Sequence, residues 1–139
     1  MSRGVQGLHV RRRGGRLAVE FRSSVLESAP AQPAIRVLAA DGRLIVRGTL
    51  SSGSCGWLLS ARASCFRRTI KLEITAMRGA LRPVAGVEDH GYEAVIRGAG
   101  VGRYLLRVSH VWLLSRDTGE MLVMPAYEGL VTFAPQPEP

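Results

Sequence analysis

The sequence predicts an all-β domain, a single antiparallel β-sandwich of about 7–9 strands. Apolar and polar residues alternate with the short period of strands that bury one face and expose the other. Turn-forming residues separate these stretches at intervals of about 8–12 residues, the spacing typical of all-β domains. No window of about ten residues shows the periodicity of an amphipathic helix.

The chain has 139 residues and is expected to form one domain. We expect a loose N-terminus over residues 1–7, the sandwich over residues 8–133 and a frayed, proline-rich tail over residues 134–139. No apolar run approaches the roughly 18 residues of a membrane-spanning helix, and the N-terminus lacks the apolar segment of a secretory signal. The sequence as it stands therefore predicts a cytoplasmic protein, with secretion as the alternative if the start codon is misplaced.

The alternation predicts strands at residues 8–10, 17–21, 35–39, 44–50, 55–65, 69–76, 92–96, 102–113 and 120–133. The first two are expected to pair around a turn at residues 11–16, and a connector with two prolines follows at residues 23–33. Asp41-Gly42 is the strongest hairpin signal in the chain, because alternating residues flank it and glycine tolerates the positive φ of a tight turn.

The middle of the chain is predicted to hold a flexible loop at residues 51–54 and a longer irregular stretch at residues 78–91. Cys55 and Cys65 lie at the two ends of one predicted strand. If that strand is unbroken, their Cα atoms are roughly 30 Å apart, well beyond the limit of about 7 Å for a disulfide. We therefore expect two free thiols. Residues 69–76 form the clearest strand, because every outward position is polar.

The last third of the chain begins with a glycine-rich corner at residues 98–101. In the strand that follows, Tyr104 and the alternate residues after it are predicted to point inward. Residues 116–119 form another hairpin turn. We expect the final strand to be interrupted near Pro125 by a bulge or a change of edge, because proline cannot donate to the hydrogen-bond ladder.

Residues 92–98 and 102–108 together resemble the corner between strands E and F of immunoglobulin-like and fibronectin-type sandwiches. In those domains a glycine precedes a tyrosine whose hydroxyl bonds back to the backbone of the preceding turn, and Tyr104 matches that tyrosine. With Asp41-Gly42, the chain also looks like small, uncharacterised immunoglobulin-like domains of GC-rich bacteria, which have no known catalytic residues. Neither cysteine follows Tyr104 by two residues, so the resemblance does not extend to the disulfide of antibody domains.

The net charge of +8 and the isoelectric point of about 10.9 favour an anionic partner. Arg11, Arg12, Arg13 and Arg16 lie on a turn with two glycines, where their guanidinium groups could grip phosphates bidentately. The alternative interpretation is a solvated turn in a protein encoded by a GC-rich genome, in which arginine replaces lysine. Aromatic residues, which single-strand binders use for stacking, are absent around this run.

A second candidate site is an apolar patch. Leu105, Val111 and Leu113 lie on one predicted strand at positions that face away from the core, as does Leu58 on another strand. Such side chains form an exposed apolar patch unless another sheet, chain or tail covers them. They predict a protein partner or a second copy of this chain.

The sequence contains no recognisable catalytic constellation. Glu88-Asp89-His90 is the densest polar cluster, but three adjacent side chains do not readily converge on one metal ion, and we expect a solvated loop. His110 is predicted to be a half-buried residue near a strand end, and Cys55 has no histidine or acid placed beside it by any motif. We therefore predict no catalytic residue, no metal and no cofactor. The sequence favours a noncatalytic interaction or assembly module, with polyanion binding through the 11–16 turn as the alternative.

Overall fold

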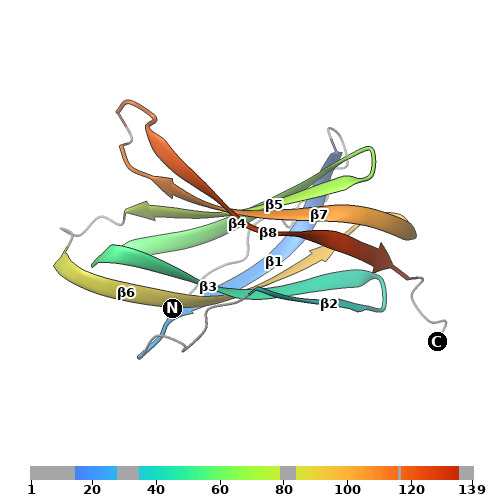
Figure 1. Ribbon diagram of the computed structural model, residues 1–139, viewed down its shortest axis with the longest axis horizontal. Helices are drawn as coiled ribbons and strands as arrows, with labels where there is room; N and C mark the ends of the chain where they lie inside the picture. The colour runs from blue at the N-terminus through green and yellow to red at the C-terminus, as the bar shows by residue number, and fades with distance from the viewer. Residues whose placement is uncertain (1–14, 28–34, 79–83, 116, 135–139) are drawn as a thin grey trace.

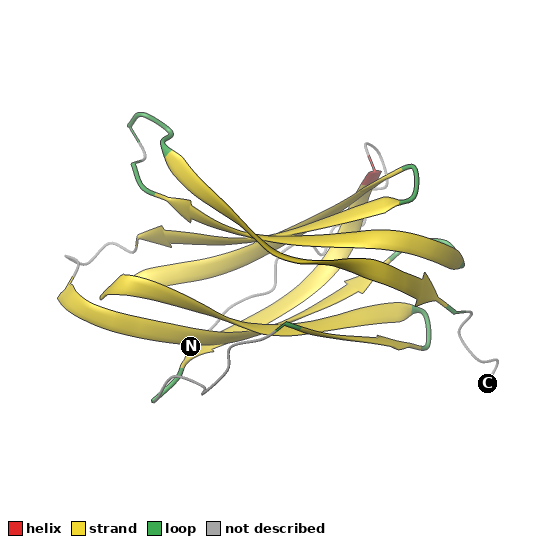
Figure 2. Ribbon diagram, in the orientation of Figure 1, coloured by secondary structure: helices red, strands yellow, loops and turns green. Residues whose placement is uncertain are grey.

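The computed structural model describes residues 15–27, 35–78, 84–115 and 117–134. These residues form one mixed sheet of eight strands in the order β2-β3-β6-β1-β4-β5-β7-β8. The strands are β1 (Arg16–Val25), β2 (Arg36–Ala40), β3 (Arg43–Cys55), β4 (Trp57–Phe66), β5 (Thr69–Arg78), β6 (Val84–Arg97), β7 (Gly102–Leu113) and β8 (Met121–Phe133). Figure 2 shows how strands dominate the described chain. Its described residues include no helix long and apolar enough to cross a membrane.

The sheet folds over itself into two layers because β1 belongs to both. Its first residues, Arg16 and Leu17, pair with β4, whereas Ala18 to Val25 pair with β6. The rest of the sheet separates accordingly into a layer of β2, β3 and β6 and a facing layer of β4, β5, β7 and β8 (Figure 1). The two end strands, β2 and β8, also approach each other, so the sheet is nearly closed.

The all-β prediction is confirmed, but the sheet is not wholly antiparallel. Strands β5 and β7 run parallel, with Thr69 opposite Leu105 and Met77 opposite Leu113. The chain leaves the upper layer after β5, crosses the lower layer as β6 and returns as β7 (Figure 1). The chain reverses direction between β5 and β6 and again between β6 and β7. Strand β7 therefore lies beside β5 and runs in the same direction.

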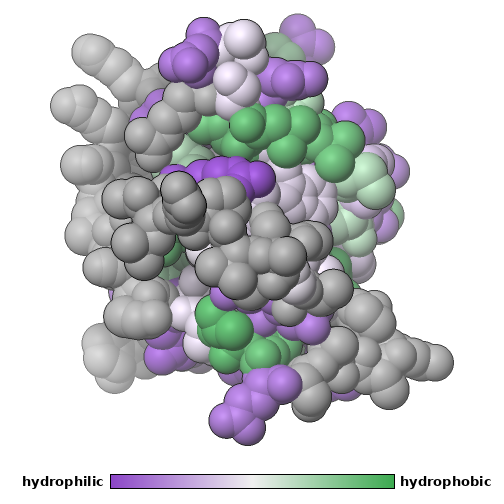
Figure 3. Space-filling view, turned by 90° about the vertical axis from the view of Figure 1, so that its left-hand side faces the viewer, coloured by the Kyte–Doolittle hydropathy of each residue, from purple (hydrophilic) through white to green (hydrophobic). Residues whose placement is uncertain are grey.

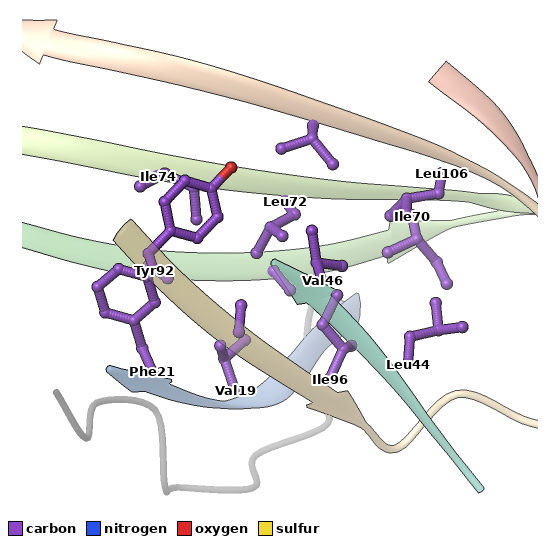
Figure 4. Packing of buried hydrophobic residues seen from close by; sticks show 14 of the residues in the cluster. Val19, Phe21, Leu44, Val46, Ile70, Leu72, Ile74, Tyr92, Ile96 and Leu106 are labelled. Atoms are coloured by element: carbon purple, nitrogen blue, oxygen red, sulfur yellow. The ribbon is translucent and has the colours of Figure 1, made fainter. Parts of the chain in front are cut away.

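Alternating side chains from both layers fill the space between them. Strand β5 buries every second residue, as predicted from its polar outer positions. The fully enclosed side chains interdigitate between the layers (Figure 4), and they include Leu44, Val46, Ile70, Leu72, Ile74, Ile96 and Leu106. This packed interior supplies the hydrophobic stabilisation expected of a domain of this size.

Two predicted loops are strands in the structure. Residues 51–54 continue β3 as far as Cys55, and most of the irregular stretch at 78–91 belongs to β6. The two segments pair with each other, with Ser52 opposite Glu88, and a register shift lies between Ser52 and Ser54. Glycine, serine and proline residues suggested loops, but a ladder is held by backbone hydrogen bonds, which these two segments form with each other.

The predicted strand at 55–65 is divided at Gly56, which has a φ of 95° and separates β3 from β4. Cys65 is free, as expected, and the side chain of Cys55 lies outside the described residues. The Asp41-Gly42 hairpin is confirmed, with Ala40 opposite Arg43 and a φ of 76° at Gly42. The predicted interruption of the last strand is confirmed as well, because the register shifts where Tyr127 and Pro125 face consecutive residues of β7.

Candidate interaction surface

The outward face of the β4-β5-β7-β8 layer carries an apolar row at one end. The strand register places Leu58 beside Met77, Met77 beside Leu113 and Leu113 beside Met121. Leu58 is 62% exposed and Met121 is 55% exposed, while the two residues between them are half-buried. We call these four residues the apolar row. Figure 3 views this end of the molecule and shows apolar side chains gathered in a band between polar ones.

The start of β8 extends this apolar surface. Met121, Leu122, Val123 and Met124 are each about half-exposed, at 55%, 48%, 54% and 48%. Alternate residues of a strand point to opposite faces, so both faces of β8 are open here. In Figure 1 the β7–β8 hairpin rises away from the two layers at this end. Strand β8 also ends the sheet order, so one of its edges has no strand beside it among the described residues.

The predicted patch of Leu105, Val111 and Leu113 is not a single exposed patch. Leu113 belongs to the apolar row, but Val111 is only 6% exposed. Val111 lies between Thr75 of β5 and Val123 of β8 in a three-strand ladder, so neighbours flank it on both sides. Leu105 faces outward near the opposite end of β7, where it is half-buried beside Leu130.

A charged band crosses the same face between these two apolar regions. The register aligns Arg16, Ser64, Lys71, Arg107 and Glu128 across five strands. Glu128 lies 3.0 Å from Arg107, and in the neighbouring row Glu73 lies 3.0 Å from Arg62. Of the basic turn predicted from the sequence, only Arg16 is described; Arg11, Arg12 and Arg13 lie outside the described residues, as does His9.

A cluster of hydrogen-bonded polar side chains lies in the interior, at the same end of the molecule as the apolar row. Tyr92 Oη is 2.7 Å from His110 Nε2, and the two rings meet edge to face at 5.5 Å. Trp112 packs against His110 and donates from Nε1 to Ser52 Oγ at 3.4 Å. Burial lowers the pKa of His110 and raises the pKa of Tyr92. Each of these buried polar side chains thus has a partner, as a stable interior requires.

Glu88, Asp89 and His90 do not form a solvated loop. They lie on β6, where His90 is 3% exposed and its Nε2 is 3.0 Å from Glu88 Oε1. Glu88 Oε1 also accepts a hydrogen bond from the backbone N–H of Gly56 at 3.1 Å, and Asp89 accepts one from Ser51 Oγ. The cluster therefore joins β6 to β3 and to the break before β4. Within the described ranges, no three histidine, cysteine or acidic side chains converge to hold a metal ion.

Tyr104 occupies the corner that the sequence indicated. Its hydroxyl donates to the backbone carbonyl of Gly100 at 2.8 Å. Its ring is 5% exposed, meets Phe133 edge to face at 5.6 Å and lies 5.0 Å from the Arg68 guanidinium carbon. The expected hydroxyl-to-backbone bond is present.

Comparison with known proteins adds no relative from which a function could be transferred. No protein-family model matches this sequence, and neither the curated proteins nor the solved structures include one that matches it. What this protein does must therefore be inferred from its own residues and their geometry.

Proposed function

We propose that this protein is a noncatalytic assembly module that binds a second copy of itself through the apolar row and the start of β8. The observation that carries this proposal is the apolar surface that continues from Leu58 across four strands to the open edge at Met121. Exposed apolar surface of this kind marks interaction sites in soluble proteins. An uncovered strand edge is likewise a template for pairing with another strand.

A second copy fits this surface for two reasons. Residues 121–124 carry no charge, so two copies can pair along this edge without placing like charges opposite each other. An antiparallel pair of identical strands also has a two-fold axis, which gives each copy the same contacts and closes the assembly at a dimer. The bulge and Pro125 bound the pairing segment, because Pro125 has no N–H to donate.

The noncatalytic part of the proposal is supported by the partners of the titratable groups in the interior. His110 is bonded to Tyr92 and His90 to Glu88, and both histidines are less than a tenth exposed. These contacts support structural roles for both histidines. We also propose that the fold is an immunoglobulin-like sandwich, for which the bond between Tyr104 and Gly100 is the main support.

Light scattering after size exclusion tests the assembly proposal. We expect a dimer whose mass does not change between low and high salt, because apolar burial is not weakened by screening. Val123→Glu should shift the protein to a monomer, since it places a charge within the proposed contact. Leu38→Glu is the matched control, because Leu38 is 56% exposed on the other end strand, β2, and should leave the dimer intact. A wild-type monomer at high concentration would overturn the proposal.

A further inference from the structure

The charged band contains an open hollow of about 280 Å³ where β1, β4 and β5 meet. Arg16, Arg62, Ser64, Lys71 and Glu73 line it. Three cations, one hydroxyl and one carboxylate thus surround a space large enough for a phosphate group. The hollow lies away from the apolar row, on the stretch of the outward face that β1 contributes through Arg16.

The residues that line the hollow lie on paired strands, which fix the positions of their backbone atoms. Arg16 is in register with Ser64, and Gly15 before it has a φ of 74°. A Cβ atom at Gly15 would lie 2.3 Å from the carbonyl oxygen of Cys65, so only glycine allows this close approach of β1 to β4. Arg62 is held by its ion pair with Glu73. In the described part of the chain, Arg16 and Lys71 have no carboxylate within ion-pair distance, so their charges are available to a ligand.

Where the structure describes it, the outward face of the other layer carries both paired and unpaired cations. Arg22 and Arg47 both bond to Glu93, at 2.7 and 2.9 Å, and Arg97 bonds to Glu20 at 3.0 Å. Arg36 and Arg43 lie on the same face, in register with Arg47 and Arg97, and have no carboxylate within ion-pair distance among the described residues. What distinguishes the hollow is that Arg16, Arg62 and Lys71 line one space in a protein with a net charge of +8.

An aromatic side chain lies beside the hollow. Phe66 follows Ser64 by two residues on β4, so both point to the outward face. Phe66 is 72% exposed, and the guanidinium carbon of Arg67 lies 5.2 Å from the centre of its ring. Leu105 and Leu130 lie in the same row, two and three strands away from Phe66, with Thr69 of β5 between. The sequence suggested no aromatic partner for the basic turn, because Phe66 is far from Arg16 along the chain and close to it only in the sheet.

We propose that this hollow and Phe66 bind single-stranded nucleic acid. Arg16, Lys71 and Arg62 contact backbone phosphates, and a base stacks on the exposed ring of Phe66. Proteins that bind single strands without sequence preference combine a cationic groove with aromatic stacking platforms in this way. A duplex offers its phosphates but not the face of an unstacked base, so the exposed aromatic ring favours the single strand.

The test is fluorescence anisotropy with a labelled oligothymidylate, titrated over a range of salt concentrations. Binding should weaken linearly on a logarithmic salt scale. Arg16→Ala/Lys71→Ala should lower the magnitude of the salt slope by about 1.4, since each phosphate contact in a single strand contributes about 0.7. Phe66→Ala should weaken binding by about 5- to 150-fold at every salt concentration, and Phe66→Trp should retain it.

Arg36→Ala/Arg47→Ala is the control, because it removes the same charge from the outward face of the other layer. Equal losses in the two double variants would show that net charge alone attracts the strand and would overturn the site. Absence of binding at low salt would also overturn the site. Equal binding of a duplex and a single strand, together with no effect of Phe66→Ala, would overturn it as well. Val123→Glu should bind the oligonucleotide like the wild type, which separates this site from the proposed dimer contact.

Discussion

Tyr104→Ala is expected to lower the free energy of unfolding by about 3–5 kcal/mol, the cost of removing a large buried aromatic side chain. The ring is 5% exposed and its edge-to-face partner Phe133 is 1% exposed, so truncation leaves a cavity that solvent does not readily fill. The substitution also removes the stacking partner of Arg68 and the hydrogen bond to Gly100. Urea unfolding, monitored by tryptophan fluorescence, measures the change.

Tyr104→Phe separates the hydrogen bond from the packing. It keeps the ring and removes only the bond to the Gly100 carbonyl, so we expect a loss of about 1 kcal/mol. Gly100 is exposed, and water can hydrate its carbonyl in the variant. Tyr127→Phe is the matched control, because Tyr127 is a half-buried tyrosine of β8 and we expect little change there. If the two phenylalanine variants lose the same stability, the corner bond does not stabilise the fold.

The Tyr104 corner could be predicted because its signals are local. A glycine-rich turn, an alternating strand and a tyrosine at its inward start are adjacent in the sequence, and the same holds for Asp41-Gly42. The parallel pairing of β5 and β7 could not be predicted in this way. It depends on β6 joining the opposite layer, and the start of β6 reads as a loop because glycines such as Gly86 and Gly91 punctuate it. The hydrogen bonds of Glu88 to Gly56 and of Asp89 to Ser51 exist only once β3 and β6 are paired.

For the candidate surfaces, too, local signals could be predicted from the sequence and contacts between distant strands could not. Side-chain parity alone indicated that Leu58 and Leu113 face outward. The register that joins them through Met77 is set by contacts between strands far apart in sequence, so the apolar row could not be assembled from the sequence. Val111 has the same parity and is nevertheless only 6% exposed, a difference that parity does not predict. The basic hollow likewise combines Arg16 with Lys71, which no local motif connects.

We also expect the protein to lose stability as the pH falls below about 6.5, the pKa of an exposed histidine. His110 is 9% exposed, and burial lowers its pKa in the folded state. Below pH 6.5 the unfolded chain therefore takes up a proton at this position that the folded protein does not, and stability falls towards the lower, folded pKa. The slope from this one group is at most about 1.4 kcal/mol per pH unit. Glu93, whose pKa Arg22 and Arg47 lower, contributes a loss only below about pH 4.5.

Three variants test whether His110 and its partner Tyr92 cause this dependence. His110→Gln removes the titrating group and should flatten the stability profile immediately below about pH 6.5. Tyr92→Phe should cost about 1–3 kcal/mol at neutral pH, because it leaves His110 Nε2 buried without its partner. Gly48→Ala should act on the same bond indirectly, since a Cβ atom there would lie 2.6 Å from Tyr92 Oη and 2.5 Å from Ile35 Cδ1. If His110→Gln keeps the wild-type slope in this range, another group is responsible and the pair between the layers is not the pH-sensitive element.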